Sequence, residues 1–207
     1  MQYFEKPFVS WRNDIALFMG PRLSGYSAVD VEDLSEVEIR SRQLTSGHLE
    51  VYRNYAPGFE NAFLMLGAPQ IGVRHSRRLI GFNKVSRAQW DEGKIWDDEI
   101  GVSTSLAPKF PNISVPYGAL VPSGIDGVVG AGRHIACDTN SHSFLREIPQ
   151  CWMTGQAAGI AAALAADSGT RPRELAPRLI QRELLAQGAY LSASIASLAA
   201  PAAYAAE

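Results

Sequence analysis

The 207-residue chain is predicted to have an α/β fold, and three observations support this class. Helical patterns occur near residues 35–55, 155–166 and 177–188, and each is followed by proline or glycine. Short apolar runs that suit strands lie between them, and the clearest begins at Val128 and ends in glycines. Hydrophobic residues make up 46% of the chain and charged residues 19%, as expected for a globular protein with a buried core.

The first part of the chain is predicted to contain short strands and one long helix. Residues 1–34 mix aromatic and polar side chains with turn formers, which favours one or two strands joined by turns. Ser35 and Glu38 form an S-x-x-E capping box, so the helix is expected to begin at Ser35 and to stop before Pro57. Its apolar stripe comprises Val37, Leu44, Val51 and Tyr55.

The middle of the chain is predicted to be mostly extended. Residues 63–66 are interpreted as a buried strand, and residues 71–81 as one extended segment or a tight pair of strands. A second capping box at Ser86 predicts a short helix. Residues 95–116 are expected to form a long irregular connection, and residues 117–127 a strand followed by a turn.

Two charged clusters in this middle region each allow two interpretations. Residues 74–78 contain three arginines and a histidine, which suit either a carboxylate or phosphate ligand or a solvated sheet edge. Asp97, Asp98 and Glu99 could bind a divalent cation, but adjacent carboxylates on a loop are more often solvated. We therefore expect no metal site.

The last part of the chain is predicted to contain one strand, one loop and two helices. The strand covers Val128–Arg133, and residues 137–142 are interpreted as a loop. The first helix is expected to start at Gly155 with very small residues, and the second at Pro177. The tail from Ser192 onward is nearly all alanine and serine, so it is expected to be flexible.

Charge and cysteine content exclude several classes of function. A net charge of −2 gives no electrostatic case for binding nucleic acid. The first residues lack a secretion signal, and the apolar helix near residues 156–166 is too short to span a membrane. Cys137 and Cys151 form no C-x-x-C pair, so the chain alone cannot build a four-cysteine zinc or iron–sulfur site. We expect a cytoplasmic protein with no membrane contact.

The stretch from Val128 to Ala166 is predicted to contact a bound ligand. Gly130 and Gly132 would let a ligand approach the backbone closely. A helix start made of small residues would leave its free N–H groups open to a bound group. The stretch is not a G-x-G-x-x-G dinucleotide loop, because Ile135 occupies the third glycine position and a loop follows it.

Four motifs then occur in a recognisable order. Residues 72–81 read G-x-R-x-S-R-R-x-x-G, and residues 122–126 read P-x-G-I-D. Residues 128–133 read V-x-G-A-G-R, and a G-Q-A-A-G run begins at Gly155. Over roughly residues 58–191 the chain resembles the C-terminal portion of the FAD-dependent oxidoreductase family, which is broadly related to fumarate reductase and succinate dehydrogenase flavoproteins. His75 departs from the pattern, because the family often has an acidic residue there.

The resemblance implies an incomplete FAD-binding Rossmann-like domain, consisting of its last strand and C-terminal helices, with part of an α+β substrate domain. It implies FAD as the cofactor. The residues implied beside the ribityl–phosphate chain are Gly130, Ala131, Gly132 and Arg133. The residues implied beside the flavin ring are Pro149, Gly155, Gln156, Ala157 and Ala158.

The resemblance also implies a division of the chain and a partner. Residues 1–116 would form the substrate-side portion, residues 117–191 the C-terminal FAD-binding portion, and residues 192–207 the flexible tail. No G-x-G-x-x-G occurs in the 207 residues, so the part that would hold the ADP half of FAD is missing. We expect an N-terminal FAD-binding subunit or missing half to supply it, and the chain alone not to hold FAD tightly.

The function implied is hydride transfer from a small organic substrate to the flavin. Arg146, His142 and Arg74 are the candidates for binding or protonating that substrate, since arginine orients carboxylates and histidine titrates near neutrality. Two alternatives stay open. One is a dehydrogenase of C–C bonds that resembles fumarate reductase, and the other is a truncated chain that acts only as an association module.

Overall fold

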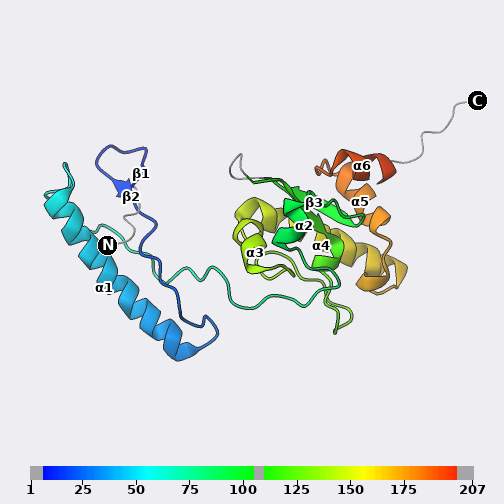
Figure 1. Cartoon of the computed structure of the whole chain (residues 1–207), viewed down its shortest axis with the longest axis horizontal. Coiled ribbons are helices and arrows are strands. Elements are labelled where there is room, and N and C mark those ends of the chain that lie inside the picture. The colour runs from blue at the N-terminus through cyan, green and yellow to red at the C-terminus, as the bar shows by residue number, and fades with distance from the viewer. Residues whose placement is uncertain (1–6, 105–109, 200–207) are drawn as a thin grey trace, which may run out of the picture. The chain divides into compact units, whose positions relative to one another are not determined.

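The structure is a computed structural model that describes residues 7–104 and 110–199, apart from the side chain of Val9. The chain divides into two units, one ending at Ser76 and the other beginning at Arg77 (Figure 1). The expected boundary at residues 116/117 lies inside the second unit. It follows that the structural division differs from the predicted one, and the assignment of each portion to substrate or flavin stays a prediction.

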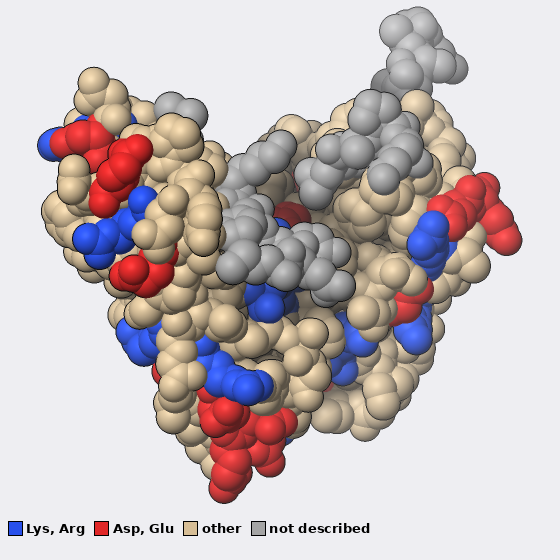
Figure 2. All heavy atoms as spheres, turned by 60° about the vertical axis from the view of Figure 1, so that its left-hand side comes forward, with Lys and Arg blue, Asp and Glu red and all other residues tan. Residues whose placement is uncertain are grey.

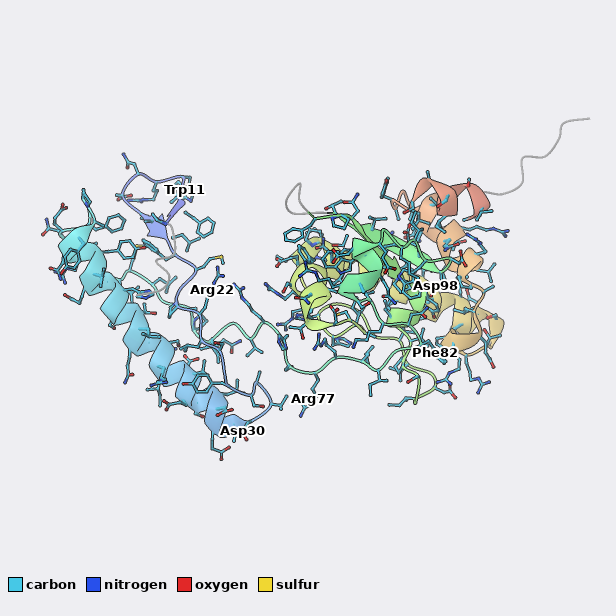
Figure 3. All side chains as sticks on the ribbon, in the orientation of Figure 1. Trp11, Arg22, Asp30, Arg77, Phe82 and Asp98 are labelled. Carbon is cyan, nitrogen blue, oxygen red and sulfur yellow. The ribbon has the colours of Figure 1, made fainter. Side chains whose placement is uncertain are left out.

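The first unit contains a two-stranded sheet and one long helix. Its elements are β1 (Phe8–Val9), β2 (Ala16–Leu17) and α1 (Val31–Tyr55). The strands pair antiparallel, with Phe8 opposite Leu17. Trp11 lies in the connection between them and is 95% exposed (Figure 3). The predicted short strands near the N-terminus are confirmed.

Helix α1 begins four residues earlier than the predicted start at Ser35. Asp30 is the N-cap, and its carboxylate accepts a hydrogen bond from the backbone N–H of Asp33 at 3.0 Å. The hydroxyl of Ser35 instead donates to the carbonyl of Val31 inside the helix. The prediction of a capping box at Ser35 is therefore wrong, whereas the predicted end of the helix before Pro57 is confirmed.

The first unit has no buried core among its described side chains. Phe63 is 78% exposed and Leu66 is 83% exposed, so the predicted buried strand at residues 63–66 is wrong. Residues 71–80 have no regular secondary structure, so the predicted pair of strands is not formed there. The rings of Phe18, Tyr52 and Phe59 pack together in this unit, with the ring centroids of Phe18 and Tyr52 4.8 Å apart.

The second unit is a mixture of helices with one small sheet. Its elements in chain order are α2 (Arg87–Asp91), β3 (Glu99–Ser103), β4 (Ile113–Pro116), η1 (Tyr117–Ala119), α3 (Thr139–Leu145), α4 (Ile148–Ser168), η2 (Pro172–Glu174), α5 (Pro177–Ala186) and α6 (Ala193–Ala199). This mixture agrees with the predicted α/β class. The capping box at Ser86 is confirmed, since the side-chain oxygen of Gln89 accepts its N–H at 2.9 Å.

Strands β3 and β4 form an antiparallel hairpin at the centre of this unit. The register places Ser103 opposite Ile113 and Glu99 opposite Pro116. The hairpin corrects the expectation of an irregular connection over residues 95–116, although residues 105–109 lie outside the described ranges. Tyr117 begins a buried 3-10 turn, so the strand predicted from residue 117 is also wrong.

Two of the three acidic residues that were predicted to be solvated, Asp98 and Glu99, have structural roles at the start of the hairpin, whereas Asp97 is exposed. The side chain of Glu99 is fully buried. The carboxylate of Asp98 accepts hydrogen bonds from the backbone N–H of Gly118 at 2.8 Å and from the amide of Asn83 at 3.1 Å (Figure 3). Among the described residues, no three His, Cys, Asp or Glu side chains gather as a metal-binding group.

Helices α4, α5 and α6 pack in sequence beside the hairpin. Pro177 starts α5 as predicted, and Ile180 and Leu184 are its buried residues with Gln181. Residues 193–199 form α6, whose Ile195 is buried, so the prediction of a flexible tail is wrong for this stretch. Residues 200–207 lie outside the described part of the chain.

The core of the molecule lies in the second unit. Its largest buried side chains come from the hairpin, the segment before α3, and helices α3 to α5, and they include Ile100, Leu120, Ile135, Leu145, Ile180 and Leu184. Basic and acidic side chains are mixed on the face drawn in Figure 2, in keeping with the small net charge. No helix among the described residues is long and apolar enough to cross a membrane.

Candidate functional site

The segment Gly130–Arg133 is an ordered turn and not the predicted strand. The backbone N–H of Gly130 donates to the carbonyl of Leu120 at 2.8 Å. A side chain at position 130 would meet the Nε2 atom of His134 at 2.9 Å and collide with Leu79. Gly132 has a φ of +83°, a conformation that favours glycine. Glycine is therefore required at the two positions for different reasons: close packing at Gly130 and backbone conformation at Gly132.

Residues 127–133 run along helix α4 in the direction opposite to that of the helix. Gly132 lies beside its first turns, where the N–H of Gly132 donates to the hydroxyl of Thr154 at 2.9 Å. A Cβ built on Gly132 would lie 3.8 Å from the sulfur of Cys151. Gly127 and Val129 lie farther along the helix, beside a groove. The two predicted cofactor segments are thus brought together by the fold.

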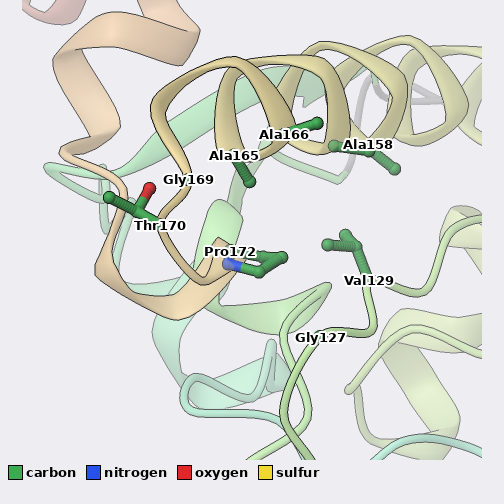
Figure 4. Close-up of a pocket in the computed structure, with 9 residues that line it drawn as sticks. Gly127, Val129, Ala158, Ala165, Ala166, Gly169, Thr170 and Pro172 are labelled. Atoms are coloured by element: carbon green, nitrogen blue, oxygen red, sulfur yellow. The ribbon is translucent and has the colours of Figure 1, made fainter.

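The groove has a volume of about 480 Å³ and is lined by small and apolar residues (Figure 4). In Figure 4 Val129 faces Ala158 at one end of it, Thr170 lies at the other end, and Pro172 lies between them. The lining residues are Gly127, Val129, Ala158, Ala162, Ala165, Ala166, Gly169, Thr170 and Pro172. Of the predicted ring-contacting residues, only Ala158 reaches this groove.

Helix α4 begins two turns earlier than the predicted start at Gly155. Glu147 is the N-cap, Pro149 lies in the first turn, and Cys151 makes a backbone hydrogen bond to the Glu147 carbonyl at 3.0 Å. The free N–H groups of the helix start therefore belong to Ile148 and Gln150. Proline at the first turn is tolerated because its missing N–H would have had no helical partner.

The Gly-Gln-Ala-Ala run consequently lies within the helix, and its members face different surroundings. A side chain at Gly155 would meet no atom within 4 Å, and the amide of Gln156 donates to the side chain of Gln187 at 3.0 Å. Ala157 is fully buried, and Ala158 lines the groove. The expectation that this run supplies free N–H groups at the helix start is wrong.

The candidate catalytic residue His142 lies within α3, and Arg146 follows that helix in the short link to α4. His142 is only 2% exposed, and its Nε2 atom lies 2.9 Å from the carbonyl oxygen of Arg133. A carbonyl only accepts, so Nε2 donates this hydrogen bond. Arg146 pairs with the carboxylate of Glu147 at 3.3 Å. Burial of His142 argues for support of the Gly130–Arg133 segment and against proton exchange with a substrate.

The arginines of the G-x-R-x-S-R-R motif are divided between the two units. Arg74, the third catalytic candidate, is exposed in the first unit, whereas Arg78 belongs to the second. One guanidinium nitrogen of Arg78 lies 3.3 Å from the hydroxyl of Thr139, and its other terminal nitrogen is buried without a hydrogen-bond partner. Because Arg78 is partly buried, the cationic cluster is not wholly a solvated edge.

Both cysteines are free thiols with a suppressed tendency to ionise. Burial raises the pKa of Cys137 above its ordinary value, and nearby Arg78 opposes the shift only in part. Burial also raises the pKa of Cys151. A redox or nucleophilic role would require a lowered thiol pKa, so neither cysteine has the chemistry of a catalytic thiol.

Two polar residues at the start of α4 were not identified from the sequence. Thr154 is fully buried and joins Gly132 to the helix. Gln150 is 6% exposed, and its amide donates to the hydroxyl of Ser103 at 3.1 Å while its side-chain oxygen is buried without a partner. A polar residue within an otherwise small and apolar helix was the available signal for both.

Comparison with known proteins gives one match. The family model described as FAD dependent oxidoreductase matches residues 9–184, which begins well before residue 58, where the motifs had placed the similarity. No curated protein and no solved structure gives a significant match. FAD is the cofactor of this family, and the mixture of helices and small sheets is consistent with part of an α/β flavoprotein domain. The chain belongs to the FAD-dependent oxidoreductase family.

Proposed function

We propose that this chain supplies the flavin-contacting part of an FAD-dependent oxidoreductase. The observation that carries the proposal is the contact between Gly132 and the first turns of α4, through the 2.9 Å hydrogen bond to Thr154. It joins a glycine turn, where backbone is open to close approach, to a helix start with free N–H groups. These are the two features that a flavin and its ribityl chain would require of this region.

The residues present fit that part of FAD. Gly132 places no side chain between the turn and a ligand, and a Cβ there would approach nothing closer than 3.8 Å, whereas the space beside Gly130 is filled by Leu79 and His134. The N–H groups of Ile148 and Gln150 begin a helix of 21 residues, whose dipole favours negative charge at that end. We assign Gly130–Arg133, Pro149 and Gln150 to the cofactor. Gly155, Gln156 and Ala158 are assigned to the adjoining helix face, with Ala157 as support beneath it.

When bound, FAD would supply two-electron redox chemistry, here hydride acceptance from a C–H bond of a small organic substrate. The start of α4 stabilises negative charge that develops beside it. Arg146, partly buried and paired with Glu147, orients a carboxylate or oxyanion of the substrate, and Arg74 is a second candidate for that role. His142 supports the turn from beneath.

The proposed enzyme requires an ADP-binding half that lies outside these 207 residues. The sequence contains no G-x-G-x-x-G, and each of the described sheets has two strands. The apolar residues 63–66 are exposed in the first unit, where a partner would bury them. We infer that a separate subunit or another part of a longer protein covers the exposed residues 63–66 and binds the adenylate of FAD.

The experiment is co-expression of this chain with a protein that carries G-x-G-x-x-G from a neighbouring reading frame. The expected result is a yellow complex that contains FAD in stoichiometric amount. Gly132→Val provides the matched control, because a β-branched residue cannot adopt a φ of +83° without strain, and its complex should lose flavin. A colourless complex, or full retention of FAD by the Gly132→Val complex, would contradict the proposal.

One observation favours a second candidate function, that of an association module. None of the described side chains of the first unit is buried, and its exposed apolar residues include Phe63, Met65 and Leu66. A module of this kind would form the same complex but contribute no flavin contact. In the co-expression experiment the association module predicts a complex whose flavin content is unaffected by Gly132→Val.

The other alternative, a fumarate-reductase-like activity, would appear in the co-expressed complex as flavin reoxidation by an unsaturated dicarboxylate.

A further inference from the structure

The turn Gly130–Arg133 is held at three points by groups from other parts of the second unit. The carbonyl of Leu120 accepts the Gly130 N–H at 2.8 Å, and the hydroxyl of Thr154 accepts the Gly132 N–H at 2.9 Å. Nε2 of His142 donates to the Arg133 carbonyl at 2.9 Å. Three of the four residues of the turn, Gly130, Gly132 and Arg133, therefore each have a backbone group hydrogen-bonded to a residue outside the turn.

Thr154 supplies the hydrogen-bond acceptor for the backbone N–H of Gly132. Its side chain is fully buried on the second turn of α4. The hydroxyl uses its hydrogen to donate to the carbonyl of Gln150 at 2.9 Å, so a lone pair of its oxygen is available to accept the N–H of Gly132. Without this hydroxyl the Gly132 N–H would have no acceptor at this position, and φ of +83° would lose its external support.

His142 holds the other end of the same turn from α3. Its ring is 2% exposed, which removes it from contact with a substrate in solution. Asp138 caps α3 by accepting the N–H of Ser141 at 2.7 Å, and this fixes the helix that carries the ring. The capped helix α3 therefore fixes the position from which Nε2 of His142 donates its hydrogen bond.

We propose that Thr154 and His142 are positioning residues that preorganise Gly130–Arg133 for the flavin cofactor. The inference rests on the proposed function of the turn as a flavin contact. Both residues act through hydrogen bonds to the backbone of the turn and touch no reacting atom. Loss of either bond leaves the turn mobile, so binding must then include the free-energy cost of ordering it.

The test uses matched variants of the full chain, titrated with FAD by quenching of flavin fluorescence. Thr154→Val keeps the shape and removes the hydroxyl, whereas Thr154→Ser keeps the hydroxyl. We expect Thr154→Val to weaken FAD binding by about 3- to 10-fold, the effect of one net hydrogen bond, and Thr154→Ser to bind like the wild type. His142→Leu should weaken binding similarly, and His142→Gln, which retains an N–H donor, should restore part of it.

Hydrogen exchange of the Gly132 amide gives a readout that is independent of the cofactor. It should accelerate in Thr154→Val and stay slow in Thr154→Ser, with both variants retaining the thermal midpoint of a folded chain. Wild-type chain that binds no flavin would overturn the proposed function, and the positioning roles with it. Wild-type binding that Thr154→Val leaves unchanged, or that Thr154→Ser weakens equally, would overturn only the positioning role.

Discussion

The carboxylate of Glu99 on β3 accepts both hydrogen bonds that Ser192 offers at the start of α6. The backbone N–H of Ser192 donates at 2.6 Å and its hydroxyl at 2.9 Å. Glu99 is fully buried, so its carboxyl oxygens are satisfied by these hydrogen bonds and not by bulk water. This contact fixes the end of a helix 93 residues away along the chain.

Replacement of Glu99 by alanine should therefore destabilise the chain by about 2–3 kcal/mol, because it leaves the two donors of Ser192 without their acceptor. Urea unfolding measures the change. Ser192→Ala removes only the hydroxyl donor and should cost about 1 kcal/mol. A Glu99→Ala variant as stable as Ser192→Ala would mean that the backbone N–H does not depend on the carboxylate.

Gly81, the last glycine of the G-x-R-x-S-R-R-x-x-G motif, is predicted to tolerate no side chain. A Cβ there would lie 2.7 Å from the backbone oxygen of Gly118 and 2.9 Å from the Cβ of Ala136. Gly81→Ala should destabilise the second unit by about 1–3 kcal/mol, as for an overpacked core. Gly124→Ala is the control, because no atom lies within 4 Å of that position. Equal thermal midpoints for the two variants would refute the steric explanation.

Asp138 should make stability depend on acid pH. Burial alone would raise the pKa of its carboxyl, but hydrogen bonds from the backbone N–H groups of Ser141 and Arg87 bring the pKa below its ordinary value of 3.8. Because the folded-state pKa is the lower one, this stabilisation is present above about pH 4 and is lost as the pH falls through the folded value.

Asp138→Asn keeps a good N-cap acceptor but has no charge to titrate. Its free energy of unfolding should therefore change less than that of the wild type between about pH 6 and about pH 3. Urea titrations at the two pH values measure this difference. An identical loss of stability in both proteins would show that other carboxylates account for the acid sensitivity.

The thiols of the folded chain should react slowly with alkylating reagents at neutral pH. Burial raises the pKa of both Cys137 and Cys151, so little thiolate is present, and Cys137 is only 4% exposed. Mass spectrometry of iodoacetamide-treated protein should find Cys137 modified much more slowly than Cys151, and both modified rapidly in urea. Rapid labelling of Cys137 in the native chain would contradict its buried position.

Local signals in the sequence were sufficient for some elements. Helix α5 begins at Pro177 because proline favours the first helical position. It ends just before Gly188, whose φ of +79° does not continue a helix. Ser86 and Gln89 predicted α2 for the same kind of reason, since both halves of a capping box lie within one turn. Even so, the competing cap at Asp30 displaced the predicted start of α1.

Elements that depend on distant contacts could not be predicted in this way. The β3–β4 hairpin depends on pairing such as Val102 with Ser114, and the α6 helix depends on the buried Glu99. The helix expected to start at Gly155 begins at Ile148, with Pro149 in its first turn. For the candidate site, the glycines of the turn were found from the motif, whereas Thr154 was missed because its role appears only when Gly132 packs on the helix.

The most direct test of the flavin-contacting role is a titration of the purified chain with FAD and with FMN, followed by flavin absorbance and fluorescence. Without an adenylate grip, the chain should purify without flavin and bind the two ligands weakly and with similar affinity, within about threefold of each other. ADP should not compete. Stoichiometric FAD that stays tightly bound through purification, or FAD binding that ADP displaces, would contradict the account.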